Sequence, residues 1–153
     1  MELKVLTFML ESEEFAVDIM KVDRVKEYEK TTKLPNAADF VEGIINLMGE
    51  VVPVINLRKK FSLPDFEDKE KTKIIVIRFS DEKKLGFLVD DVKEVITLTE
   101  EQIEQAPEYG NTSSEYLLGI AKLENRMVLV LDVEKILLKS EKIALEQLVN
   151  VNK

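Results

Sequence analysis

Residues 40–58 read FVEGIINLMGEVVPVINLR and carry the clearest pattern in the chain, two short apolar runs on either side of Met48-Gly49. Short apolar runs around a glycine-containing turn are typical of a β-hairpin. The pattern returns 76 residues later without a gap, which predicts a duplicated structural unit. The aligned pairs are Gly43 with Gly119, Ile44 with Ile120, Leu47 with Leu123, Val52 with Val128, Val54 with Val130 and Asn56 with Asp132.

The similarity extends upstream of both copies. Phe15-Ala16-Val17-Asp18 resembles Phe87-Leu88-Val89-Asp90, and each segment is followed by Val-x-x-Val. We therefore expect one domain over residues 1–153, made of two similar five-stranded barrels. The polar stretch 62–72 places the division between a half of about 1–68 and a half of about 69–153. Neither half is long enough for a large core of its own, so the two barrels should share an apolar seam.

The expected fold class is mainly β, because short apolar runs separated by turn residues dominate up to about residue 132. Short helical turns are expected over 39–42, 56–61 and 99–104. One longer helix is expected over 133–149, where apolar residues recur at helical spacing, and it should pack on the barrels. The expected strands cover 4–10, 14–18, 24–29, 44–47, 51–56, 73–79, 84–90, 93–98, 116–123 and 127–132.

The composition excludes several classes of function. The chain has 22 Lys+Arg, 30 Asp+Glu and a net charge of −8, which disfavours nucleic acid as a partner. It contains no Cys and no His, so thiol and imidazole catalysis, and the usual zinc and haem ligands, are missing. Asp90, Asp91 and Glu94 form the densest acidic cluster, but adjacent strand residues point to opposite faces and should not converge on a metal. We expect neither enzyme activity nor a cofactor.

The start of the chain does not read as a secretory signal, because an acidic residue stands at position 2 and another interrupts the apolar run at Glu11. The longest uninterrupted apolar run, Met127 to Leu131, is far shorter than the ~18 residues of a membrane span. We therefore expect a cytoplasmic protein that does not insert into the membrane.

The apolar residues around the Val-x-x-Val segments are the candidate binding surface. Leu6, Ile19, Val22, Val25 and Val92 occupy positions that could meet where the two barrels approach each other. One interpretation is that all five fill the seam. The other is a hydrophobic groove, with acidic shoulders such as Glu27 and Glu94, that accepts the apolar stripe of a partner helix.

Residues 40–58 also resemble the signature of the CheW family of chemotaxis coupling proteins. The resemblance includes residues 15–22, 98–103 and 115–119, in the family's order and over nearly the whole chain. It implies two SH3-like five-stranded barrels around a common apolar centre. It also implies a non-catalytic adaptor, located at receptor arrays on the inner face of the membrane.

The partners implied by the resemblance are the cytoplasmic helical tip of transmembrane chemoreceptors and the regulatory domain of the histidine kinase CheA. By resemblance, the receptor tip is expected in the groove at Leu6, Ile19, Val22, Val25 and Val92. A divergent CheW-like module that serves another signalling partner is the alternative.

One departure from the family pattern concerns partner choice. The family usually has Arg at the position of Met48 in Asn46-Leu47-Met48-Gly49, and often an acid at the position of Arg24. If these two positions face each other, both members of the usual ion pair are exchanged here. We expect the fold to tolerate this double change. We treat Arg24, Asn46, Met48 and Gly49 as candidate positions for partner specificity.

Overall fold

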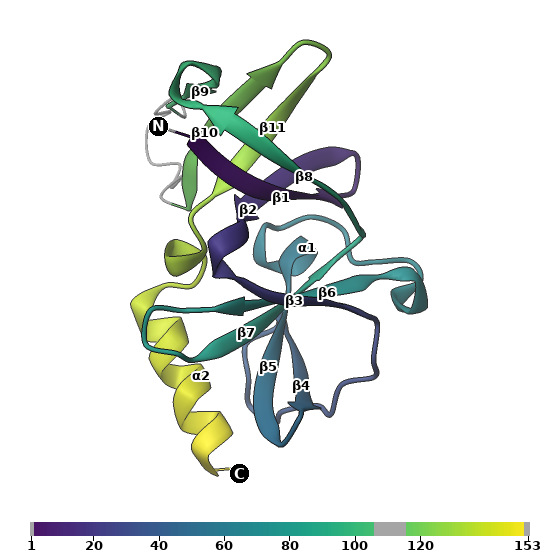
Figure 1. The fold of residues 1–153 in the computed structure, drawn as a ribbon. Coiled ribbons are helices and arrows are strands. Elements are labelled where there is room, and N and C mark those ends of the chain that lie inside the picture. Colours follow the sequence, from purple (N-terminus) through teal and green to yellow (C-terminus); the bar gives the residue numbers. More distant parts are fainter. Residues whose placement is uncertain (1, 106–115, 152–153) are drawn as a thin grey trace.

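The computed structural model describes residues 2–105 and 116–151, and these form two β-sheets with a helix near the C-terminal end (Figure 1). Each sheet makes one of two SH3-like barrels. Barrel A contains β1 (Glu2–Leu10), β2 (Glu13–Asp18), β8 (Asp91–Thr99), β9 (Ile103–Glu104), β10 (Leu117–Leu123) and β11 (Arg126–Leu131). Barrel B contains β3 (Val22–Glu27), β4 (Val41–Leu47), β5 (Glu50–Asn56), β6 (Lys73–Arg78) and β7 (Lys84–Val89).

The strand orders of the two barrels correspond. Barrel A has the order β8-β1-β2-β11-β10-β9, and barrel B has the order β3-β6-β7-β5-β4. In each barrel the central pair is parallel, β2 with β11 and β5 with β7, and the neighbouring pairs are antiparallel. The predicted duplication is therefore present in the topology, with β1–β5 as one copy and β6, β7, β8, β10 and β11 as the other.

The barrels do not follow the two halves of the chain. Barrel B is a continuous insertion, residues 22–89, whereas barrel A combines residues 2–18 with 91–131. The division expected near residue 68 falls inside barrel B, between β5 and β6, so it does not separate the two sheets. The physical reason is that each barrel closes through a parallel pair with one strand from each copy.

Equivalent details recur in both copies. The β4–β5 ladder shifts register between Val41 and Gly43, and the β10–β11 ladder shifts between Leu117 and Gly119. A Cβ on Gly119 would lie 2.6 Å from the Glu104 carbonyl oxygen, so this close approach of β9 requires glycine. Asn56 and Asp132 end the two hairpins. The backbone amide of Asn56 donates a 2.7 Å hydrogen bond to the Phe40 carbonyl, and that of Asp132 donates a 2.7 Å hydrogen bond to the Tyr116 carbonyl.

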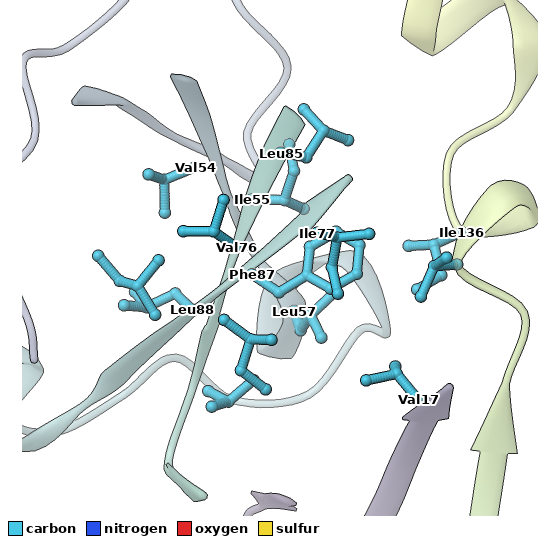
Figure 2. Close-up of a cluster of buried hydrophobic side chains, with 14 of the residues drawn as sticks. Val17, Val54, Ile55, Leu57, Val76, Ile77, Leu85, Phe87, Leu88 and Ile136 are labelled. Carbon is cyan, nitrogen blue, oxygen red and sulfur yellow. The ribbon is translucent and has the colours of Figure 1, made fainter. Parts of the chain in front are cut away.

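The main hydrophobic core lies between the barrels and continues into barrel B. Figure 2 shows Val17 of β2 and Ile136, which follows η4 (Val133–Lys135), near Ile77 and Phe87 of barrel B. The interior of barrel A is a smaller, separate cluster. Full burial of such side chains contributes ~1.5–3 kcal/mol each, so the seam is a large part of the stability. The smaller cluster contains Val5, Ala16, Leu98, Ala121, Val128 and Val130.

The helical segments partly match the predictions. The turns expected near 56–61 and 99–104 are α1 (Leu57–Lys60) and η3 (Glu100–Gln102). The turn expected over 39–42 is shorter: the chain turns at 39–40, where the Val41 amide donates a 2.9 Å hydrogen bond to the Ala38 carbonyl, and β4 starts at Val41. The single helix expected over 133–149 is divided into η4 and α2 (Lys139–Val151), because Ile136 and Leu137 turn inward to the core. Two further short turns are η1 (Ile19–Lys21) and η2 (Lys69–Lys71).

Candidate functional site

The candidate groove lies where the chain crosses between the barrels. It passes from barrel A to barrel B through η1, and returns between β7 and β8. Ile19 is the first residue of η1, and Val22 and Val92 stand at corresponding positions early in β3 and β8. All three side chains are half-buried and pack against the core between the barrels. Each therefore presents apolar surface to both the core and the solvent.

The other two predicted groove residues have different environments. Leu6 is 6% exposed and belongs to the core, opposite Val95 in the β1–β8 ladder. Val25 lies on β3 and is 43% exposed. Leu6 can therefore support the surface from beneath, whereas Val25 is free to contact a partner directly.

Sequence reasoning missed two exposed apolar residues near this crossing. Met20 in η1 is 84% exposed, and Val95 on β8 is 52% exposed. Val95 was visible in the sequence as the second valine of Val92-x-x-Val95, the counterpart of Val25 in Val22-x-x-Val25. We therefore add Val95, as the counterpart of Val25 in the repeat, to the candidate apolar surface.

Glu27 and Glu94, the two acids expected to flank the groove, each form an ion pair. Lys73 Nζ lies 2.7 Å from Glu27 Oε2, and Arg126 Nη2 lies 3.4 Å from Glu94 Oε1. Both carboxylates are well exposed, so such pairs add little stability, ~0–1 kcal/mol each. Their negative charge remains accessible to a partner.

Arg24 and Met48 face each other, which is the condition under which both members of the usual ion pair are exchanged. Arg24 Nη1 lies 3.4 Å from Met48 Sδ, and Met48 is 86% exposed. Met48 and Gly49 form the tip of the β4–β5 hairpin with φ values of 53° and 90°, while Asn46 Oδ1 accepts a 2.7 Å hydrogen bond from the Gly49 amide. Asn46 and Gly49 therefore shape the turn, and Met48 with Arg24 forms its exposed surface.

A buried carboxylate holds Arg24 in place. The Asp23 side chain is 5% exposed and accepts a 2.8 Å hydrogen bond from Arg24 Nε and another from Arg78 Nη2. Lys84 Nζ lies 3.9 Å from the same carboxylate. The hydrogen bond from Arg24 is the largest of the effects that lower the pKa of Asp23; the charges of Lys84, Arg24 and Arg78 add to it, and burial opposes it. Asp23 therefore stays ionised and orients two exposed guanidinium groups.

Asp90, one member of the acidic cluster, pairs with Arg58. Asp90 Oδ2 accepts hydrogen bonds from Arg58 Nε at 3.0 Å and from the Glu11 amide at 2.8 Å. The bond to Asp90 is the main cause of the raised pKa of Arg58. Asp90 thus fixes the passage from β7 to β8. In residues 2–105 and 116–151, no three acidic side chains come together in a way that could hold a metal ion.

No helix in the described part of the chain is both long and apolar enough to cross a membrane. The described residues form two SH3-like barrels, and each barrel contains strands from both copies of the repeat. Apolar residues lie where the chain passes between the barrels. Together they define the class of twin-barrel CheW-like domains. A family model described as a CheW-like domain matches residues 4–141, and the chain belongs to this family.

Several relatives have sequences similar to this chain. The chemotaxis protein CheW of Klebsiella aerogenes is 43% identical over 141 residues, which cover 92% of this chain and 84% of that protein. The chemotaxis protein CheW of Bacillus subtilis is 36% identical over 135 residues, covering 88% of this chain and 86% of that protein. The crystal structure of the scaffolding protein TtCheW from Thermoanaerobacter tengcongensis matches with a TM-score of 0.79 and 34% identity, covering 86% of this chain and 90% of that one.

Proposed function

We propose that this chain is a non-catalytic adaptor that couples transmembrane chemoreceptors to the histidine kinase CheA in bacterial chemotaxis signalling. The observation that carries the proposal is the match to the CheW-like family over residues 4–141. Relatives that align with most of the chain are named chemotaxis proteins, and a structural neighbour is named a scaffolding protein. The adaptor would work at receptor arrays on the inner face of the membrane.

The receptor tip is proposed to bind at the crossing between the barrels. A helical hairpin offers apolar side chains at i, i+3 and i+4, and these suit a partly apolar surface. Val25 and Val95 provide exposed contacts, while Ile19, Val22 and Val92 provide half-buried ones. Leu6 would support this surface from the core. The kinase is proposed to contact other surfaces, at the barrel ends.

Arg24 and Met48 are proposed to influence which partner is accepted. Arg24 stands where the family often has an acid, and Met48 stands where it usually has arginine. The surface at β3 therefore presents a cation and an apolar thioether. A partner that matched the usual charges would meet like charge at Arg24, which costs affinity. Asn46 and Gly49 would act indirectly, by keeping the turn that carries Met48.

The test is binding of the full chain to two fragments, a receptor signalling hairpin and the CheA regulatory domain, measured by titration calorimetry. Val25→Asp should weaken receptor binding at least tenfold and leave kinase binding unchanged. Val22→Asp should weaken it too, but it also threatens the fold because Val22 packs on the core. The matched control is Ile143→Asp, which alters a 46% exposed residue of α2.

Two outcomes would contradict the proposal. If the folded chain binds neither fragment, the alternative of a CheW-like module for another partner is favoured. If Val25→Asp and Ile143→Asp have the same effect on receptor binding, the groove is not the receptor site. A melting curve for each variant shows that loss of binding is not loss of folding.

A further inference from the structure

The two strands that carry the valines of the candidate groove, β3 and β8, are edge strands with irregular ladders. Each stands at the end of its sheet and is hydrogen-bonded to one neighbouring strand only. The β3–β6 ladder shifts register between Val22 and Arg24, and the β1–β8 ladder shifts opposite residues 92–95. In both strands the irregular step follows the first valine of Val-x-x-Val. The ladder alone therefore holds each strand least firmly where it carries the groove residues.

In barrel B, Lys84 contacts the irregular step of β3 from the start of β7. Its Nζ lies 3.9 Å from Asp23 Oδ1, in the irregular step, and 3.3 Å from Glu50 Oε1, at the start of β5. The Lys84 side chain is largely buried and lines the pocket between barrel B and α2. Because β3 and β5 share no ladder, this ammonium group joins two strands that the sheet does not join.

Barrel A has the same arrangement with each of the three charges reversed. Glu14 Oε1 lies 3.9 Å from Lys93 Nζ, in the irregular step of β8, and 3.4 Å from Arg126 Nε, at the start of β11. β8 and β11 also share no ladder. The registers of the parallel pairs β2–β11 and β5–β7, together with the repeat, fix the equivalence. The equivalent residues of opposite charge are Glu14 for Lys84, Lys93 for Asp23, and Arg126 for Glu50.

The central charges of these two clusters are less accessible than those of ordinary surface ion pairs. The Glu14 side chain is 7% exposed, and its Oε2 atom accepts no hydrogen bond from residues 2–105 or 116–151. A buried carboxylate that is only partly compensated costs stability. The position that such a charge enforces explains it better than the stability that it adds.

The residue after each irregular step carries an exposed charge. Arg24 Nε donates a 2.8 Å hydrogen bond to Asp23 Oδ2, and the same guanidinium contacts Met48. In barrel A, Glu94 Oε1 lies 3.4 Å from Arg126 Nη2. Any shift of the irregular step therefore also moves the charged group that the strand presents to a partner.

We propose that Lys84 and Glu14 are positioning residues for the candidate groove. Lys84 fixes β3 and its valines relative to the β4–β5 turn, and Glu14 fixes β8 and its valines relative to the β10–β11 turn. The inference rests on the proposed function for the identity of the groove's occupant. The effect of the two residues on the strands is measurable without a partner.

The test uses the full chain with two neutral substitutions of similar size, Lys84→Met and Glu14→Gln, each serving as the control for the other. Amide hydrogen exchange, measured by NMR, should become about three to five times faster over residues 22–25 in Lys84→Met. Glu14→Gln should have this effect over residues 92–95 instead. Lys84→Arg keeps the charge and should restore the exchange rates of the unaltered chain.

The titration of Asp23 provides a second signal. The hydrogen bond from Arg24 is the largest cause of its lowered pKa, and the charge of Lys84 lowers it further. Lys84→Met should therefore raise the pKa of Asp23, observed through the ¹³C signal of its carboxyl group, whereas Glu14→Gln should leave it unchanged. An Asp23 pKa that does not respond to Lys84→Met would overturn the contact between the two side chains.

Binding of a receptor signalling hairpin, measured by titration calorimetry, connects the strands to the groove. Lys84→Met and Glu14→Gln should each weaken binding about threefold or more, and Lys84→Arg should restore it. Faster exchange in both strands of either variant would show a general loss of stability and overturn the proposal. The same holds if Lys84→Arg behaves like Lys84→Met, because the charge would then have no role.

Two outcomes separate this inference from the proposed function. If the strands loosen as expected but binding of the hairpin is unchanged, the positioning role in the groove is refuted and the receptor proposal stands. If the unaltered chain does not bind the hairpin, the receptor proposal fails. The exchange rates over 22–25 and 92–95 then decide by themselves whether the two residues position the strands.

Discussion

Three glycines separate two physical effects, backbone strain and close packing, and give a quantitative test of the fold. Gly49 has φ of 90°, and a Cβ added to it would meet nothing within 4 Å, so alanine there adds strain without a clash. Gly119 has the reverse character, since its Cβ would lie 2.6 Å from the Glu104 carbonyl oxygen and from Ile103 Cγ2. Gly43 combines a φ of 150° with a clash against the Thr32 carbonyl oxygen.

These geometries predict an order of destabilisation. For Gly49→Ala, strain of ~1–2 kcal/mol is partly offset by the ~0.4–1 kcal/mol of reduced freedom in the unfolded chain, leaving about 1 kcal/mol. For Gly119→Ala, overpacking against backbone costs about 2 kcal/mol. Gly43→Ala carries both effects, and about 3 kcal/mol is expected if they add.

Urea denaturation of the three variants, followed by circular dichroism, measures these differences. For a chain of this length, each kcal/mol corresponds to a change of roughly 2–4 °C in Tm, so thermal melts provide a check. The reasoning is refuted if the free energy of unfolding of Gly119→Ala lies within about 0.5 kcal/mol of that of the unaltered chain. That result would mean that β9 does not pack closely against β10 at Gly119, and that the register shift there does not require glycine.

Three further predictions concern side chains. Asp23→Asn should lower the free energy of unfolding at pH 7 by about 2 kcal/mol, because hydrogen bonds to charged groups are lost. Since folding lowers the pKa of Asp23, this deficit is complete above the unfolded pKa of about 4 and shrinks as the pH falls below it; a deficit independent of pH would contradict the assignment. A double-mutant cycle of Arg24→Glu and Met48→Arg should show favourable coupling of up to about 1 kcal/mol in chemical denaturation, and additive effects would mean that the side chains do not interact. Leu145→Ala should cost about 2–3 kcal/mol because a buried side chain is removed, whereas Ile143→Ala on the exposed side of α2 should cost less than about 1 kcal/mol; equal costs would show that α2 does not pack as described.

The strands were largely predictable because their patterns are local. Each expected strand is present, with ends displaced by a few residues. The sequence did not predict β9, because Ile103–Glu104 is too short to show an alternating pattern, and its pairing with Ala121 and Ile120 is a long-range contact. The break before α2 was also missed, because apolar residues continue through Ile136 and Leu137 and the direction of the chain there depends on the core.

The receptor groove stays a prediction, and the structure gives the burial of its five candidate residues. Ile19, Val22 and Val92 do lie at the crossing between the barrels, as the Val-x-x-Val repeat indicated. Leu6 is buried because both faces of β1 are covered, one by the interior of barrel A and the other by barrel B. Alternation along a strand cannot show this, since it distinguishes two faces but not what covers each of them.

By itself, the sequence determined the repeat, the hairpins and the apolar character of the segments that meet. Those features depend on side-chain spacing within a few residues, and they are present in the chain before it folds. Only the tertiary structure decided which strands share a barrel, because the parallel pairs β2–β11 and β5–β7 join strands from different copies. The same long-range closure decided that one hairpin face lies beneath α2 while its equivalent carries the exposed Met127.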